Sequence, residues 1–288
     1  MLTKELIENR IKNFWGYGSL DAPVWFVGME EGLADTKGPE LEDRFIATDG
    51  MATVDIRKGM KNLPTHMKFF SGPNSPTQST WKYPIWLFLY IATGKSPKKE
   101  EIRDYQVNNL GDIELKETAC IELMPLPSRK ASEETWLYSG YGIDGLDSRA
   151  EYLKKYKPQR VRELKRLIEE HKPKIIIFYS IGYLEDWTEI IGKKPEEITR
   201  QMYYTKNSER GFIVIPQGAS FGMSYDRLSD FLNKIKKKEE KEPKLVYEFA
   251  DNINIPEKER QERLDKAYDI LFTAGMRMIN AEKEKNKE

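Results

Sequence analysis

Two adjacent acids, Glu30 and Glu31, are the residues of this sequence best placed to do chemistry, because they directly follow a short apolar segment. The segment 24–27 is composed of residues that favour β-strands, and it ends at Gly28. We therefore predict a buried strand that stops at Gly28 and presents both acids at its tip. Ligands of open α/β sheets gather outside the carboxyl ends of strands, which makes both acids candidate catalytic groups. The alternative is that they solvate a turn.

A third acid, Glu122, interrupts the apolar segment 118–124, which we predict to be a second buried strand. A carboxylate in a buried strand costs free energy unless it is paired. Glu122 is therefore either part of a structural salt bridge or a group that recognises a ligand. The continuation, residues 125–129, contains two prolines and is not expected to remain in a strand ladder.

Amide and hydroxyl side chains follow a later predicted strand, residues 211–216, in the segment 217–224. Gln217, Ser220 and Ser224 stand just before a predicted helix, where backbone amides and hydroxyls can bind a phosphate. Ser224 is also the predicted N-cap of that helix.

A long segment, residues 33–80, is rich in glycine, proline and charge and is predicted to be irregular, as functional or mobile loops are. Its mixture of basic and aromatic side chains suits a polyanion that carries flat rings. The residues concerned are Arg44, Arg57, Lys58, Lys61, Lys68, Phe69 and Phe70. Arg129 and Lys130 follow the predicted second strand, and we expect both segments to line one mouth. The alternative is a solvated loop anchored by two aromatic side chains.

These candidate residues require a sheet that brings several strand ends together. Apolar periodicity predicts helices over 4–14, 84–91, 158–170, 180–191 and 225–235, and a further strand over 175–179. We therefore expect an α/β protein, with three α/β/α layers around a four-stranded parallel sheet, in residues 1–236. Residues 237–288 are expected to form a charged linker, with a C-terminal helix from Pro256 onward. His171 is expected to contact the last carbonyls of its helix.

The composition limits the possible partners. Among 288 residues, 47 basic side chains balance 47 acidic ones, so contact with nucleic acid requires a local basic surface. One cysteine, Cys120, excludes a disulfide within the chain, and two histidines make zinc improbable. The charged N-terminus and the lack of an apolar run of about 20 residues predict a cytoplasmic protein with no membrane partner. We expect a monomer without metal or other cofactor.

The order of these features resembles that of the uracil-DNA glycosylase superfamily, over roughly residues 15 to 236. The segment 27–32, Val-Gly-Met-Glu-Glu-Gly, is similar to the first motif of that family, in which Gly, a variable residue, a catalytic Asp or Asn, Pro and often Gly follow one another. Glu30 falls on the catalytic position, and Glu31 replaces the proline. The segment 215–220 stands in the place of a histidine-containing motif, but this chain has no histidine after His171.

The resemblance implies hydrolysis of the N-glycosidic bond of a nucleotide flipped out of DNA, in repair or phage defence. Glu30 would stabilise the cationic sugar and activate water, with Glu31 as the next candidate. Gln217, Ser220 and Ser224 would hold the leaving base or the flanking phosphates. Glu122 falls near a position that reads the base edge, and an ionised carboxylate there would favour the amino group of a cytosine or modified cytosine over uracil.

Two other functions remain open from the sequence. One is hydrolysis of, or transfer to or from, a free nucleotide at the same strand ends. The other is a catalytically inactive nucleic-acid-binding module, which the missing histidine and the C-terminal helix favour.

Overall fold

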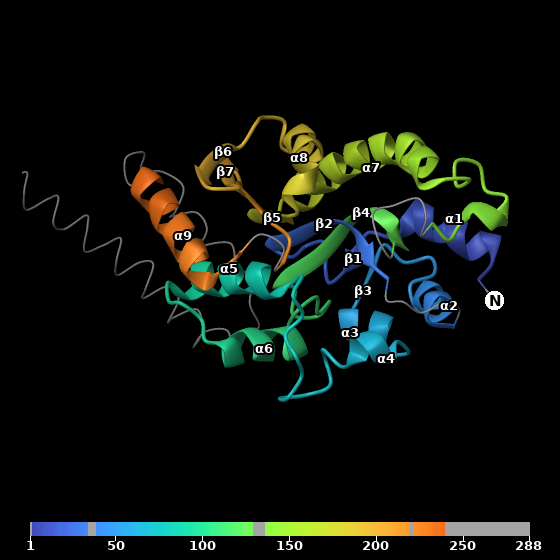
Figure 1. The fold of residues 1–288 in the computed structure, drawn as a ribbon, viewed down its shortest axis with the longest axis horizontal. Helices are drawn as coiled ribbons and strands as arrows, with labels where there is room; N and C mark the ends of the chain where they lie inside the picture. The colour runs from blue at the N-terminus through green and yellow to red at the C-terminus, as the bar shows by residue number, and fades with distance from the viewer. Residues whose placement is uncertain (1, 34–38, 129–135, 219–221, 240–288) are drawn as a thin grey trace, which may run out of the picture.

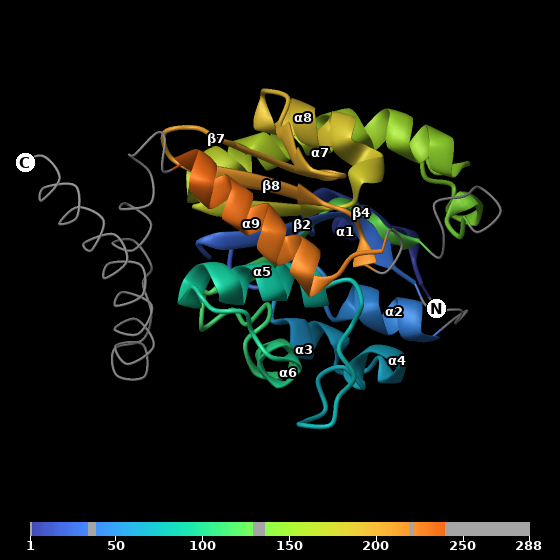
Figure 2. The ribbon, with the colours of Figure 1, turned by 60° about the vertical axis from the view of Figure 1, so that its left-hand side comes forward.

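The computed structural model of the protein describes residues 2–33, 39–128, 136–218 and 222–239. These residues form one mixed sheet of eight strands in the order β3-β1-β4-β2-β5-β8-β7-β6, with helices on both of its faces (Figures 1 and 2). The strands are β1 (Gly16–Tyr17), β2 (Val24–Gly32), β3 (Thr53–Val54), β4 (Thr118–Ser128), β5 (Ile175–Tyr179), β6 (Glu196–Thr199), β7 (Met202–Lys206) and β8 (Gly211–Ile215).

The described helices vary from a single turn to more than six turns. They are α1 (Lys4–Asn13), α2 (Pro39–Ile46), α3 (Ile56–Met60), α4 (Pro64–Met67), α5 (Lys82–Thr93), α6 (Lys99–Asn108), α7 (Arg149–His171), α8 (Leu184–Ile191) and α9 (Tyr225–Glu239), with short 3-10 turns η2 (Ser139–Tyr141) and η3 (Ile181–Tyr183). Among the residues described, no helix combines the length and apolar character needed to cross a bilayer.

The four strands predicted from sequence form the centre of the sheet. β4, β2, β5 and β8 lie side by side and parallel. The prediction of a four-stranded parallel sheet is nevertheless wrong, because β1 pairs antiparallel with β4, β7 pairs antiparallel with β8, and β6 pairs antiparallel with β7. β1 and β3 have two residues each, and β6 and β7 are largely polar and partly exposed. None of these four strands has the continuous apolar run that marks a buried strand.

The order of the central strands creates a topological switch point between β2 and β5. From β2 the chain moves to β4 on one side, and it later enters β5 on the other side of β2 before moving on to β8. Connections therefore leave the carboxyl ends of β2 and β5 in opposite directions. Ligands of open α/β sheets bind outside the strand ends at such a switch point.

Successive side chains of the sheet pack alternately into two hydrophobic cores, one on each face. Along β2, Trp25 and Val27 belong to a core shared with α1, α2, α7 and α8, whereas Val24 and Phe26 belong to a core shared with α3, α5, α6 and α9. This alternation is the two-residue period of a strand that is buried on both faces. Figure 2 shows helices on either side of the sheet, so the predicted layering of helices around a central sheet is confirmed.

β2 does not stop at Gly28, as the sequence suggested, but continues to Gly32. Its pairing with β4 is irregular between Glu30 and Gly32, so both acids lie in the last, distorted part of the strand. Glycine is needed at position 28 for packing and not to end the strand. A Cβ atom there would clash with the Tyr179 ring and lie 2.6 Å from Oε2 of Glu122.

β4 also continues farther than predicted, through both prolines to Ser128. The prediction failed because β4 pairs with β1 only at Cys120 and Ile121, so the later residues need fewer ladder donors on that edge. The proline carbonyls have side-chain partners instead. Arg10 Nε donates to the Pro125 carbonyl at 2.8 Å, and the Tyr138 hydroxyl donates to the Pro127 carbonyl at 2.9 Å.

Several predicted boundaries need correction. The segment 33–80 is not irregular throughout, because it contains α2, β3, α3 and α4. α7 begins at Arg149, not at Pro158, which lies exposed inside the helix. His171 does not cap carbonyls with its ring; its Nδ1 lies 2.9 Å from Asp21 Oδ1. α1, α5, α8 and α9 agree with the predicted helices, although α9 continues to Glu239, and the predicted C-terminal helix falls outside the described residues.

Candidate active site at the carboxyl ends of β2 and β5

The end of β2 is joined to the start of α7 by a buried ion pair. Arg149, the first residue of α7, donates from Nη2 to Oε1 of Glu30 at 2.7 Å. Only 9% of the Arg149 side chain and 10% of the Glu30 side chain are exposed. Oε2 of Glu30 is buried and has no hydrogen-bond partner among the described residues. One oxygen of this carboxylate is thus fixed in place, and the other, although closed to solvent in this conformation, keeps its capacity to accept a hydrogen bond.

The surroundings of Glu30 also change its acidity. Burial raises the pKa of Glu30, and the Arg149 guanidinium opposes that rise without cancelling it. The Tyr183 hydroxyl, which hydrogen-bonds with Arg149, has its own pKa raised by burial and by the charge of Glu30. A carboxylate with a raised pKa is a stronger base than a solvated one.

The residue that follows β5 has a strained backbone. Ser180 has φ 142° and ψ 109°, a conformation that only glycine adopts readily, and such a residue costs about 1–3 kcal/mol. Its position is fixed by two hydrogen bonds, from Trp187 Nε1 to the Ser180 carbonyl at 2.7 Å and from the Ser180 amide to the Ile215 carbonyl at 3.0 Å. The strain lies at the end of β5, the strand next to β2, at the switch point.

Glu31 has a different environment from Glu30. Arg10 donates to its Oε2, Tyr17 donates to its Oε1, and Arg44 Nη1 lies 3.6 Å from Oε2. Burial alone would raise the pKa of Glu31, but the two guanidinium groups outweigh burial and lower it. Both oxygens are therefore engaged in a buried network that ties β2 to α1, β1 and α2.

Glu122 lies inside the sheet and not at a strand end. It is opposite Gly28 in the β2–β4 ladder, and the Tyr179 hydroxyl donates to its Oε1 at 2.8 Å. Oε2 has no hydrogen-bond partner in the described part of the chain. Burial, together with the charge of Glu31, raises the pKa of Glu122 to about 8, so the group is largely protonated at neutral pH. A protonated carboxyl can donate as well as accept, which removes the argument that Glu122 is an acceptor only.

No family model and no curated protein matches this chain. A catalytic role for Glu30 or Glu31 is consequently supported only by the geometry of these acids and by the motif at residues 27–32. Within the described ranges, no group of three or more His, Cys, Asp or Glu side chains is arranged to hold a metal ion.

Two of the other predicted catalytic and phosphate-binding residues, Gln217 and Ser224, lie between β8 and α9 in the described part of the chain. Gln217 is exposed just after β8. Because β8 is two strands from β2, Gln217 lies about 10 Å from β2, measured across the sheet. Ser224 Oγ accepts a hydrogen bond from the Arg227 amide at 3.3 Å, which confirms its predicted capping role in α9. Ser220 lies outside the described residues, as do Arg129 and Lys130.

The aromatic and basic residues predicted to contact DNA have unequal environments. Phe70 is buried against Trp81, whereas Phe69 is partly buried beneath the Lys68 ammonium, 5.1 Å from its ring centre. Arg57 Nη2 lies 2.9 Å from Asp55 Oδ2 and 2.7 Å from Asp112 Oδ2, so its charge is compensated within the protein.

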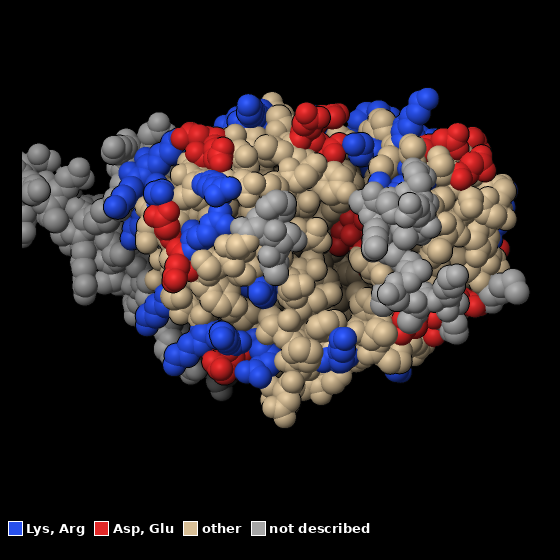
Figure 3. All heavy atoms as spheres, in the orientation of Figure 1, with Lys and Arg blue, Asp and Glu red and all other residues tan. Residues whose placement is uncertain are grey.

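The remaining predicted cations, Lys58 and Lys61, are exposed. On the face shown in Figure 3, an acidic side chain is set back in a hollow, and basic side chains lie toward α9, over α5 and α6 and over α7.

Sequence reasoning did not find Arg149, Ser180 or Tyr183. One signal for Arg149 was present: Ser148 and Glu151 have the spacing of a capping box, and Ser148 Oγ does accept from the Glu151 amide at 3.1 Å. That pattern places the start of α7, and hence Arg149, at a helix N-terminus. Nothing in the sequence indicates that this helix end meets β2.

Proposed function

We propose that the protein hydrolyses the N-glycosidic bond of a base flipped out of DNA, with Glu30 as the carboxylate that acts on the sugar. One observation carries the proposal. Glu30 lies at the carboxyl end of a central parallel strand, beside the switch point, with Oε1 held by Arg149 and Oε2 without a protein partner in the described part of the chain. The motif around Glu30 supports the same reaction class through its resemblance to uracil-DNA glycosylases.

The chemistry follows from the two oxygens of Glu30. As the bond to the base breaks, the sugar acquires positive charge, which a nearby carboxylate stabilises. Oε2 is the atom that can orient or deprotonate the attacking water, while Arg149 fixes the carboxylate through Oε1. The raised pKa of Glu30 favours proton acceptance from water. Gln217 can donate a hydrogen bond to the departing base but cannot protonate it.

The test is base release from DNA. Oligonucleotides that contain uracil, cytosine or modified cytosines are incubated with the protein and then treated with alkali, which cleaves at abasic sites. We expect cleavage with at least one of these bases, loss of cleavage in Glu30→Gln, and retention in Glu189→Gln. Glu189 is an exposed acid on α8 and supplies the matched loss of charge. DNA bound tightly without base release would identify an inactive binding module instead.

Hydrolysis of free nucleotides is the second candidate, and one contact favours it. Arg57, predicted to bind a DNA phosphate, is engaged by Asp55 and Asp112. A smaller substrate would not need that contact. Release of base from mononucleotides, with none from oligonucleotides under the same conditions, would select this candidate.

A further inference from the structure

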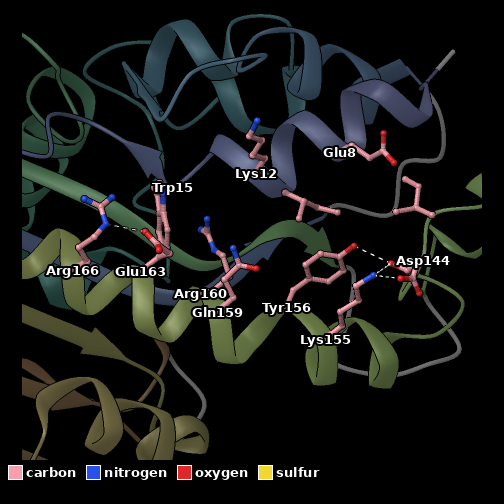
Figure 4. Close-up of a pocket in the computed structure, with 12 residues that line it drawn as sticks. Glu8, Lys12, Trp15, Asp144, Lys155, Tyr156, Gln159, Arg160, Glu163 and Arg166 are labelled. Atoms are coloured by element: carbon pink, nitrogen blue, oxygen red, sulfur yellow. Dashed lines mark hydrogen bonds and ion pairs between the residues drawn. The ribbon is translucent and has the colours of Figure 1, made fainter.

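A cavity of about 490 Å³ lies between α1 and α7, and neither Glu30, Glu31 nor Glu122 is among the residues that line it (Figure 4). Its walls include Ile11 and Trp15 from the N-terminal segment and Tyr156, Gln159 and Arg160 from α7. The residues of the candidate active site are not among those that line it. The cavity volume is within the range of small-molecule sites, about 300–1,000 Å³.

Arg160 brings a buried positive charge to this cavity, and its hydrogen bonds go to backbone carbonyls and not to a carboxylate. Its Nε donates to the Leu123 carbonyl at 2.7 Å, and its Nη2 donates to the carbonyls of Phe14 at 2.9 Å and Glu122 at 3.1 Å. Only 5% of the residue is exposed, and within the described residues no carboxylate is close enough to form an ion pair with it. Buried charges are normally paired. Nη1 therefore brings two unused N–H donors and an uncompensated positive charge to the cavity wall.

The neighbouring charges do not neutralise Arg160. Lys155 forms an ion pair with Asp144, and Arg166 Nε lies 2.9 Å from Glu163 Oε2. Each of these acids has a basic partner of its own, which leaves the guanidinium of Arg160 available to an anion.

The rest of the wall suits a flat, apolar body. The Arg160 guanidinium lies 3.2 Å from the ring centre of Trp15, and Tyr156 projects from α7 one turn away. Ile11 and Ile143 add aliphatic surface. Figure 4 shows the aromatic side chains and Arg160 between the two helices.

We propose that this cavity binds a small aromatic monoanion, whose carboxylate or sulfonate is held by Nη1 of Arg160 and whose ring packs near Trp15 and Tyr156. The site is separate from the proposed hydrolytic centre, and its occupancy does not depend on the reaction carried out there. The buried guanidinium of Arg160 sets the preference for an anionic group, and Lys12, which also lines the cavity, adds charge of the same sign.

The probe is anilinonaphthalene sulfonate, an aromatic monoanion whose fluorescence rises on transfer from water to an apolar site. N-phenylnaphthylamine is the matched neutral probe, because it has the same rings without the sulfonate. Arg160 is a poor first target, since its loss leaves three carbonyls without a partner. Gln159→Glu is better, because Gln159 is exposed on the cavity wall and the change adds a negative charge beside the guanidinium.

We expect one sulfonate probe per chain, bound more tightly than the neutral probe. Gln159→Glu should weaken the sulfonate probe roughly three- to tenfold and leave the neutral probe unchanged. Lys165→Gln, an equal change in charge at an exposed position of α7 outside the cavity, should affect neither probe. Unfolding temperature and circular dichroism verify that each variant is folded. Equal binding of both probes, or a sulfonate affinity that Gln159→Glu does not alter, would overturn the proposal.

Discussion

Arg149 and Glu30 form a buried ion pair, with Nη2 and Oε1 2.7 Å apart, that fixes the N-terminus of α7 to the carboxyl end of β2. The helix N-terminus carries a partial positive charge, which adds to that of the guanidinium. Glu30 is thereby held at the carboxyl end of β2, beside the switch point between β2 and β5. The same pair leaves Oε2 without a protein partner in the described residues, and the first two predictions depend on this arrangement.

Glu30→Gln should lower the single-turnover rate of base release by about 10²- to 10⁴-fold, the usual contribution of a positioned acid or base. The amide keeps the shape of the side chain but can neither take a proton from water nor neutralise a cationic sugar. Single-turnover assays on the most rapidly cleaved oligonucleotide measure the effect, with Glu189→Gln as the control. A rate near that of the wild type would remove Glu30 from the mechanism.

Arg149→Gln should shift the pH profile of the reaction. Arg149 opposes the upward shift of the Glu30 pKa, so its removal should raise that pKa further and move the acidic limb of the profile to higher pH. The variant should also be less stable, by about 3–5 kcal/mol, because a buried charge loses its partner. Rate measurements from pH 5 to pH 9 and urea unfolding provide the two readouts. A lower rate with an unchanged acidic limb would assign Arg149 a purely structural role.

Glu122→Gln should change how stability depends on pH. The folded-state pKa of Glu122 is about 8, above the ordinary value of 4.5, so between these values the folded protein binds more protons than the unfolded chain. Stability from this group is therefore full below pH 4.5 and is lost as pH rises toward 8. Glutamine cannot ionise and should abolish that loss.

Urea unfolding of both proteins at pH 5 and pH 9 tests the prediction for Glu122. The variant should gain stability relative to the wild type between these pH values, on the order of a few kcal/mol. An identical pH dependence of the two proteins would show that Glu122 is ionised in the folded state at neutral pH.

Gly28→Ala and Gly32→Ala form a matched pair within β2. A Cβ at Gly28 would meet the Tyr179 ring and Oε2 of Glu122, whereas a Cβ at Gly32 meets no atom of the described residues within 4 Å. We expect Gly28→Ala to lose about 1–3 kcal/mol of stability through overpacking, and Gly32→Ala to be nearly neutral. Thermal unfolding distinguishes them, and equal stability would contradict the described packing of Tyr179 over β2.

The accuracy of the sequence predictions followed the physical origin of each feature. The four central strands were predictable because each contains an apolar run buried on both faces, and Glu30 was found because it follows one of them. β1 and β3 are too short to produce a pattern. The partners of Glu31, which are Arg10 and Arg44, come from α1 and α2 through tertiary packing, which no local pattern encodes.

DNA binding should depend on specific exposed lysines and not on net charge, which is zero. Lys58 and Lys61 are exposed on and after α3, while the charge of nearby Arg57 is compensated by Asp55 and Asp112. If both lysines contact phosphates, replacing them with glutamine should reduce the slope of log affinity against log salt by about two units.

The matched control for the lysine pair replaces Lys154 and Lys165, two exposed residues of α7, with glutamine. This control removes the same charge from a helix on the opposite core of the protein. Because counterions are released only where cations meet phosphates, the control should keep the wild-type slope. Titrations of labelled duplex DNA over a series of salt concentrations measure both slopes. Equal losses in the two double variants would attribute binding to overall charge, and an unchanged slope in the Lys58 and Lys61 variant would place the DNA on another surface, such as the basic region toward α9 (Figure 3).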